Sequence, residues 1–518
     1  MKRKLVLSQA SRRGRLRRTS RAIGIGLLVA AVPVLATAAP PAAPRTVADA
    51  EPAPAPALVP PAPGADELVK RLRNRVAQPG GLTSEAVARR AVQTSTEDRI
   101  RAADVESAAA EVTRSDVGYY PKVTLSARYT RLSPITPPVL GTVAVPRDQT
   151  LAAGAPLAGR DLRALPLTFP VILDNYMLQA NVVVPLSDYF LRIGQAHGAA
   201  LATQQSASIT REASRRTAAA QAKLLYYSWA RLRLQEAVTE QSVEQSRRHL
   251  ELARAGRDTG RMPEVEVLRA ESAVASAELL HERTTNAAVV AEERLRTVLH
   301  EPGDAPYRIG EDLLASAPAA MVDGSDALYA EALQRRPEMR AFERSEASLR
   351  AQRSATASTG APRLDAFGNG YVANPSPRVF PQKDEWRATW NVGVQIVWSP
   401  NDLGGSDAST RGLDAQRRKL DAERAAVKDA LRDEISAAVV ATKEARVASE
   451  TANRGLVAAE ESYRVRRELF ELGRATEVEL IDAETDVLRA RLEMIQARVD
   501  ARVARVQLDH AVGRDAAP

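Results

Sequence analysis

The sequence of 518 residues contains no cysteine. This absence excludes a disulfide framework, a thiolate metal site, a cysteine nucleophile and a lipid-modified cysteine. Histidine is scarce, and the five copies show no metal-ligand spacing: His197, His249, His281, His300 and His510. Phosphate-binding loops, nucleophile elbows and dinucleotide fingerprints are also missing. We therefore expect a protein that is not an enzyme and that has no catalytic residues, cofactor or metal site.

The chain has little net charge outside its first 38 residues. Residues 1–38 contain nine Lys and Arg residues and no acidic residue, and removing these nine from the net charge of +8 leaves −1. The basic excess is therefore not a nucleic-acid footprint, and we expect no nucleic-acid partner.

The basic start has the layout of an export signal. An apolar run over 22–35 follows it, and Ala36-Thr37-Ala38 forms an A-x-A cleavage site, so we predict a signal peptide over 1–38. Ser11-Arg12-Arg13 leaves both Sec and twin-arginine export open. The alternative is an N-terminal membrane anchor, although the run is shorter than the ~20 residues of a spanning helix. Residues 39–81 follow as a Pro/Ala-rich leader.

The rest of the sequence repeats itself once. GRMPEVEVLRAE begins at Gly260 and GRATEVELIDAE begins at Gly473, with seven identities in twelve residues. We therefore predict two copies of one unit, at 82–310 and 326–518, joined by a linker at 311–325. This period is too long for an ordinary solenoid.

Each unit is expected to run helix, strand, loop, strand, long helix, tight turn, helix. The first helix of each unit is expected over Thr83 to Val117 and from Asp326 as N-cap to about Ser358. Strands with alternating apolar and polar residues are expected at about 121–132, 172–186, 363–372 and 386–399. Long helices are expected at 195–259 and 411–472, the first about 95 Å long at 1.5 Å per residue.

The last helix, 477–512, has the spacing of a coiled-coil seam. Its seam positions, all apolar except Thr485, follow steps of three and four residues: Val478, Ile481, Thr485, Leu488, Leu492, Ile495, Val499, Val503 and Val506. The turn at Gly473 then makes this helix antiparallel to the one before it. An isolated antiparallel coiled coil would give the same pattern.

The aromatic residues gather around the strands. Thirteen of the 21 lie within 119–190 and 367–398, as in the aromatic girdles of a transmembrane β-barrel. A soluble sheet packed against helices is the alternative. The residues expected at the membrane interface are Tyr129, Tyr176, Trp386, Trp390 and Trp398. Four strands cannot close a barrel, whereas three copies would supply twelve strands.

These features together resemble the TolC-like outer-membrane efflux protein family. The resemblance rests on the two-fold repeat, the strand ending VVVPLSD at Asp188, the segment ALQRRPE at 332–338 and the two glycine turns, and it covers 82–514. It implies a mainly α fold with a transmembrane β-barrel portion. In this fold, long antiparallel helices and four strands per chain trimerise into a 12-stranded barrel and a periplasmic α-barrel tunnel.

The resemblance also implies a function. Members of this family are outer-membrane exit ducts of tripartite efflux pumps or type I secretion systems, with the helices in the periplasm. The expected partners are two further copies of the chain, outer-membrane lipid, a periplasmic adaptor and, indirectly, an inner-membrane pump. The pump and adaptor set the cargo. A periplasmic coiled-coil adaptor or structural scaffold is the alternative.

The resemblance assigns roles to residues at the helical tips. The turn residues Gly260, Arg261, Gly473 and Arg474 would dock the adaptor. Three acidic residues would form rings around the periplasmic aperture, with Arg261 or Arg474 offsetting their repulsion: Glu479, Asp482 and Glu266. The alternative for the acidic residues is an ordinary solvated helix face.

Overall fold

The computed structural model describes residues 65–136, 141–146, 162–166, 171–303, 305–315 and 324–515. The chain divides into two compact units, Met1–Val59 and Pro60–Pro518, and every described residue belongs to the second. The expected signal peptide and the start of the leader lie outside the described residues.

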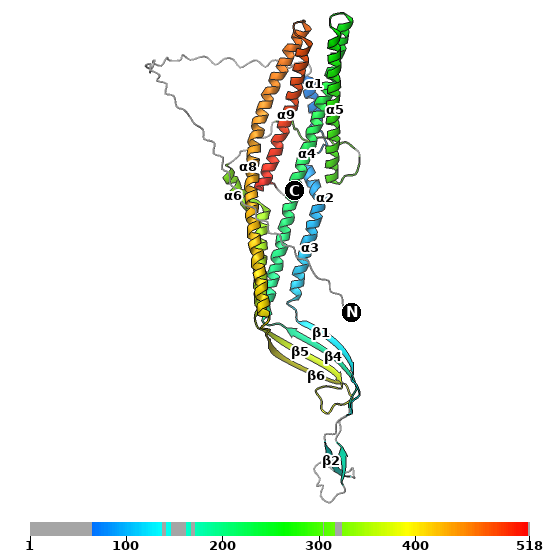
Figure 1. Cartoon of the computed structure of the whole chain (residues 1–518), viewed down its shortest axis with the longest axis vertical. Coiled ribbons are helices and arrows are strands. Elements are labelled where there is room, and N and C mark those ends of the chain that lie inside the picture. The colour runs from blue at the N-terminus through cyan, green and yellow to red at the C-terminus, as the bar shows by residue number, and fades with distance from the viewer. Residues whose placement is uncertain are drawn as a thin grey trace, which may run out of the picture. The chain divides into compact units, whose positions relative to one another are not determined.

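The second unit is mainly helical (Figure 1). Its first half contains α1 (Ala65–Arg75), α2 (Ser84–Thr94), α3 (Thr96–Val117), a π-helical turn (Tyr189–Ile193), α4 (Gly194–Asp258) and α5 (Glu264–Leu299). Its second half contains α6 (Ser325–Arg335), α7 (Pro337–Ala357), a short 3-10 turn (Ser358–Gly360), α8 (Asp402–Glu471) and α9 (Glu477–Val512). The order helix, two paired strands, long helix, turn, helix thus occurs in both halves.

Two expected helices are each divided in the structure. The helix expected over 83–117 is broken at Ser95, because the Ser95 side chain accepts a hydrogen bond from Asp98 N (3.2 Å) and starts a new helix there. The helix expected over 326–358 is broken at Arg336, because Pro337 lacks an N–H and disfavours a helical conformation in the residue before it. Its N-cap is Gly324 rather than Asp326.

Helix α1 lies within the range that the sequence analysis assigns to the leader. It packs on α4 through ion pairs of Arg71 with Glu244 (2.9 Å) and Arg75 with Glu240 (2.8 Å). Leu72 is buried in the main core beside it. The chain is therefore fixed to the helical body from α1 onward.

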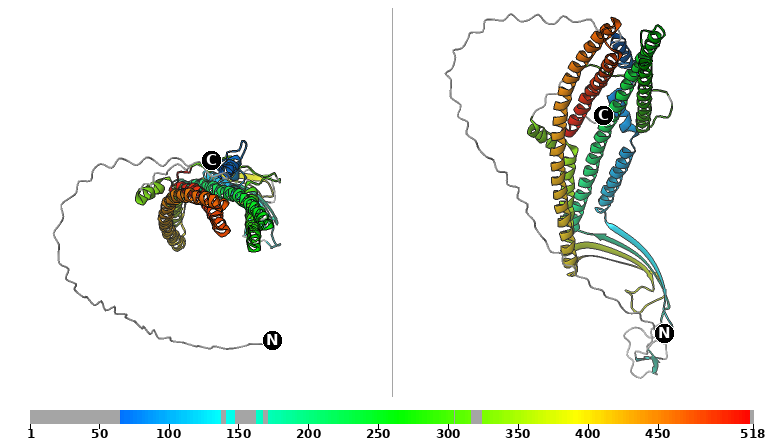
Figure 2. Two further views of the ribbon diagram at one scale, coloured as in Figure 1. Left: turned by 90° about the horizontal axis from the view of Figure 1, so that it is seen from above. Right: turned by 45° about the horizontal axis from the view of Figure 1, so that its top comes forward.

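The main core lies where α4, α5 and α9 meet. Its largest fully buried side chains include Tyr226, Trp229 and Leu234 of α4, with Leu295 of α5 and Ile495 of α9. The four longest helices pack side by side in the order α8, α9, α4, α5, as Figures 1 and 2 show. Helices α5 and α8 therefore each have one long neighbour only.

Four antiparallel strands form one sheet in the order β1-β4-β5-β6. Their bounds are Lys122–Arg131, Asp174–Val184, Arg363–Asn374 and Arg387–Val397. A second, two-stranded sheet pairs β2 (Thr142–Pro146) with β3 (Leu162–Pro166). Only a loop was expected between the first two predicted strands. The two short strands were not predicted, because their residues show no clear alternation of apolar and polar side chains.

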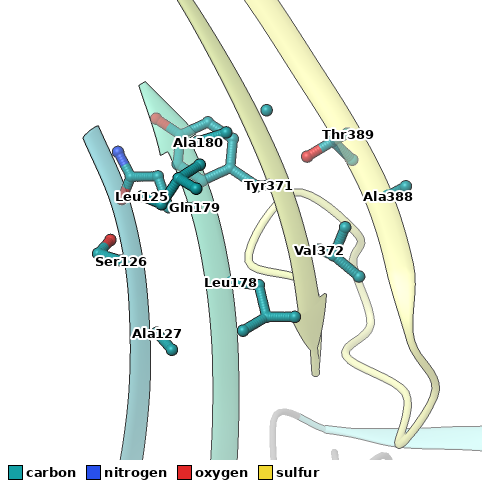
Figure 3. A pocket seen from close by; sticks show the side chains of 11 residues that line it. Leu125, Ser126, Ala127, Leu178, Gln179, Ala180, Tyr371, Val372, Ala388 and Thr389 are labelled. Carbon is teal, nitrogen blue, oxygen red and sulfur yellow. The ribbon is translucent and has the colours of Figure 1, made fainter. Parts of the chain in front are cut away.

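The four-stranded sheet has one apolar and one polar face. Two cross-strand rows of the apolar face are Val123, Val182, Gly368 and Val392, and Leu125, Ala180, Gly370 and Trp390. The intervening rows contain Thr124, Asn181, Asn369 and Asn391, and Ser126, Gln179, Tyr371 and Thr389. Figure 3 shows several of these side chains on neighbouring strands.

Candidate functional site at the helical tips and the sheet

The two long hairpins reverse at equivalent glycines. Gly260 and Gly473 both have φ of +71°, a left-handed conformation that glycine adopts without steric cost. At each turn the residue after the glycine donates its N–H to the carbonyl five residues earlier: Arg261 to Gly256 and Arg474 to Leu469, both at 2.8 Å. This is the Schellman pattern of helix termination. The two tips therefore share one backbone design.

Glu479 lies in the first turn of α9 and has local partners. Its carboxylate accepts hydrogen bonds from the N–H (2.8 Å) and the hydroxyl (3.1 Å) of Thr476, and it pairs with Arg466 at 3.3 Å. The Thr476 N–H is the main cause that holds the pKa of Glu479 below its usual value, followed by the Thr476 hydroxyl and Arg466. Glu479 is therefore an exposed carboxylate that stays charged.

Asp482 is exposed and forms no ion pair within the described part of this chain. It lies three residues after Glu479, so both carboxylates share one face of α9. Arg261 and Arg474 are exposed at the turns and have no ion pair among the described residues. Within one chain, the cation beside Glu479 is thus Arg466 of α8, which the sequence analysis did not name.

Glu266 lies apart from this pair of acidic residues. It forms an ion pair with Arg269 (2.9 Å), and one of its carboxylate oxygens is buried without a hydrogen bond. Its charge contributes to raising the pKa of Glu477, so the two carboxylates face each other. The structure therefore brings Glu266 to the first residue of α9 rather than to Glu479 or Asp482.

A buried pair of titratable residues, not predicted from the sequence, lies near the tips. His249 Nε2 of α4 lies 3.0 Å from Glu477 Oε1 of α9, and these side chains are 7% and 2% exposed. Burial is the largest cause that raises the pKa of Glu477, to about 7. No sequence signal joins the two residues, because 228 positions separate them.

A groove lies between the two hairpins beside this pair. It has a volume of about 1040 Å³ and is lined from both sides, by His249, Leu252 and Met262 of the first hairpin region and by Phe470 and Leu480 of the second. The rings of His249 and Phe470 lie 6.1 Å apart. The tips are thus in contact at His249 but leave open space next to it.

The five aromatic residues that the sequence predicts at the membrane interface fall into groups along the sheet. Tyr129, Tyr176 and Trp386 lie together at the end of the sheet away from the long helices, with ring centroids 5.1 Å and 5.9 Å apart. Trp398 follows β6 at the opposite end and donates its indole N–H to Gly360 O (3.1 Å). Trp390 lies between these ends on the apolar face and is 74% exposed.

The distance between the two ends matches a bilayer. Trp386 and Trp398 flank the 11-residue strand β6. Twelve residue steps of about 3.3 Å give roughly 40 Å along the strand, and a tilt of about 45° reduces the height to roughly 28 Å. An outward apolar band of a membrane barrel is about 25 Å tall.

The described residues contain no group of three or more His, Cys, Asp or Glu residues that could hold a metal ion. In the same residues, no helix is both long enough and apolar enough to cross a bilayer.

Solved structures of outer-membrane channels share this fold. CusC, whose structures describe transmembrane channel formation, is 14% identical with a TM-score of 0.65, and the match covers 83% of this chain and 92% of CusC. The CmeC outer membrane channel of Campylobacter jejuni gives 14% identity and a TM-score of 0.65 over 84% of this chain and 88% of CmeC. The open MtrE outer membrane channel of Neisseria gonorrhoeae is 15% identical with a TM-score of 0.60, and the match covers 83% of this chain and 88% of MtrE. At these identities the likeness establishes the fold. No curated protein gives a significant match.

The fold thus defines a mainly helical protein with a small antiparallel sheet. The model of the outer membrane efflux protein family matches residues 99–300 and 328–514, which is most of the chain. The chain belongs to this family, a family of outer-membrane channels rather than enzymes, and the TolC-like resemblance is confirmed.

Proposed function

We propose that this chain forms the homotrimeric outer-membrane exit duct of a tripartite efflux pump or type I secretion system. Its two halves are two copies of one structural repeat. Three chains form a 12-stranded barrel in the outer membrane and a helical tunnel in the periplasm. The duct conducts substrates passively and performs no chemistry of its own.

The observation that carries this proposal is the sheet of a single chain. Among the described strands, β1 and β6 each have one neighbour, so one edge of each has backbone groups without a strand partner. The apolar face is highly exposed, with Trp390, Val392 and Ile396 each more than 70% exposed. An apolar face suits lipid, but unpaired strand edges in lipid do not. Pairing β6 of one copy with β1 of the next satisfies both requirements.

The helices support the same mode of assembly. Helix α5, at one end of the row of long helices, exposes Val265, Leu268 and Leu279. Helix α8, at the other end, exposes Val440 and Val447. A second copy that covers these faces would extend the row in the same direction as the sheet.

At the tips, we propose that the turns at Gly260, Arg261, Gly473 and Arg474 dock a periplasmic adaptor, which links the duct to an inner-membrane pump. Glu479, Asp482 and Glu266 would each form a ring of three carboxylates around the aperture, with Glu266 next to Glu477 rather than to the other two. Such rings favour cations over anions. The lowered pKa of Glu479, and the exposure of Asp482 without an ion pair among the described residues, support this role.

The test is fractionation of an expressing Gram-negative cell, followed by native mass measurement of the detergent-extracted protein. We expect the protein in the outer membrane at the mass of three mature chains. A soluble periplasmic monomer or dimer would overturn the duct and favour the adaptor or scaffold alternative.

Conductance in planar bilayers tests the aperture separately. Glu479→Ala and Asp482→Ala should each lower the preference for cations over anions. Asp509→Ala is the control, because Asp509 is an α9 carboxylate near the opposite end of the helix from the tip, paired with Arg505 at 3.2 Å. Unchanged selectivity in both variants would remove the aperture role.

A further inference from the structure

One contact near the tips differs from its neighbours. Most polar contacts between side chains there remain within one hairpin, such as Arg254 with Glu271 and Arg466 with Glu479. His249 with Glu477 instead joins the first hairpin to the second. The strength of this contact therefore affects how firmly the two hairpins hold together.

Several charged and titratable groups face this contact from every helix packed around it. They are Arg248 of α4, Glu266 and Arg269 of α5, Tyr463 and Arg467 of α8, and Glu484 of α9. The second oxygens of Glu266 and Glu477 are both buried without a hydrogen bond in the structure. A proton placed on either carboxyl could bond to such an oxygen, whereas two carboxylates would repel each other.

We propose that His249, Glu266 and Glu477 form a proton-dependent latch, which holds the first turn of α9 against the α4–α5 hairpin and releases it when the cluster loses a proton. The latch is formed entirely by residues of one chain, so it does not depend on the proposed function. Its consequence, an aperture that loosens as pH rises, rests on the proposed function.

The direction follows from the change in proton binding. Burial, followed by the charge of Glu266, raises the pKa of Glu477 from 4.5 to about 7 in the docked state, and exposure on release returns it to the ordinary value. Packing of the first turn of α9 against the α4–α5 hairpin therefore takes up a proton on Glu477, and separation of the two releases that proton. Its contribution is complete below pH 4.5 and is lost as pH rises through about 7. Within this window the ratio of docked to released chains falls by up to about tenfold per pH unit.

The absence of cysteine allows a direct test in the full-length protein. Arg261→Cys with Arg474→Cys would carry one spin label on each exposed tip. Trimers assembled with excess unlabelled chain isolate the distance within one protomer, which is measured by pulsed electron paramagnetic resonance from pH 5 to 8.5. We expect a short distance at low pH and a growing longer-distance population as pH rises.

Three variants assign the effect to the latch. Glu477→Gln cannot lose the proton, so the short distance should persist at pH 8.5. Glu266→Gln removes the facing charge from the other hairpin, so the transition should persist but alter its midpoint, and it also serves if the first variant does not fold. Glu271→Gln is the matched control, since Glu271 is an exposed α5 carboxylate paired within its own hairpin, and it should follow the wild type.

A wild-type distance that is independent of pH, or a Glu477→Gln variant that follows the wild type, would overturn the latch. Native mass on the same samples separates this outcome from failure of the duct. A trimer with an invariant distance keeps the duct and removes the latch. A monomer whose distance depends on pH would keep the latch and remove the duct.

Discussion

At the scale of single residues, the tips depend on two glycines whose backbone conformation other residues adopt only at a cost. Gly260 and Gly473 have φ of +71°, and nothing lies within 4 Å of a Cβ placed on either. A side chain there would meet open space, so the penalty of substitution is one of backbone strain alone.

Gly473→Ala should therefore destabilise the tip by about 1–2 kcal/mol, the cost of a left-handed non-glycine residue. Gly455→Ala is the matched control. Gly455 lies inside α8 with open space around it and without a positive φ, so alanine there should stabilise the helix by about 1 kcal/mol. Thermal unfolding followed by circular dichroism should rank G455A above the wild type and G473A below it. The reverse ranking would contradict the backbone account.

The sequence could predict these glycines but not the residue of greatest interest beside them. The turn at Gly473 is predictable because the sequence around it repeats that around Gly260, and because glycine suits a reversal between two helices. Glu477 reads as an ordinary acidic residue in a first helical turn, where anions are favourable. Only the packing of α9 on α4 buries it against His249, and nothing in the sequence specifies that packing.

At the scale of elements, a charged clamp joins α3 to α4. Arg211 of α4 donates two hydrogen bonds to the carboxylate of Asp98, both at 2.8 Å, and Asp98 is only 16% exposed. The Arg211 hydrogen bond is the main cause that lowers the pKa of Asp98 below 3.8. The clamp therefore contributes stability above that pH and loses it in stronger acid.

Asp98→Asn should cost about 2 kcal/mol at pH 7, because it replaces two charge-assisted hydrogen bonds. The difference from the wild type should shrink as the pH falls below 3.8, since the wild-type carboxylate is then protonated too. Asp104→Asn is the control: Asp104 is on the same helix, is 54% exposed and pairs only with Arg101. Denaturant unfolding at both pH values measures the difference. Equal effects of both variants at pH 7 would argue against the clamp.

The long elements were largely predictable, while their interruptions were not recognised. Residues 195–259 and 477–512 were expected as helices, and α4 and α9 occupy nearly the same residues. The breaks at Ser95 and Arg336 carried local signals, namely a serine three residues before Asp98 and the proline at 337. The residues on both sides of each break favour a helix, so helix propensity alone predicts one continuous helix. A single capping residue or proline is enough to interrupt it.

At the scale of the whole molecule, the two faces of the sheet should differ in their tolerance of charge. Val392 and Asn391 are neighbours on β6 and lie on opposite faces. In the proposed barrel, Val392→Arg would place a cation against lipid, at a cost of about 2–4 kcal/mol near the bilayer centre. Asn391→Arg would lie on the polar face.

We therefore expect Val392→Arg to lower the yield of heat-resistant trimer in outer-membrane fractions strongly, and Asn391→Arg to lower it little. Electrophoresis of unheated samples measures both. If Asn391→Arg were the more damaging variant, the lipid-facing and lumen-facing sides of the sheet would have to be exchanged.

The interrupted helices also have a mechanical consequence. Helices α4 and α8 are unbroken over 65 and 70 residues, but the helices laid against them change along the way, from α3 through α2 to α5 and from α7 through α6 to α9. Each half of the chain thus has one continuous long helix and, packed on it, a series of shorter helices with breaks between them. The pair of helices bends most easily at a break, because only the continuous helix spans it. The joints near residues 95 and 336 are therefore where flexing should concentrate, so that the tips can move while the sheet remains still.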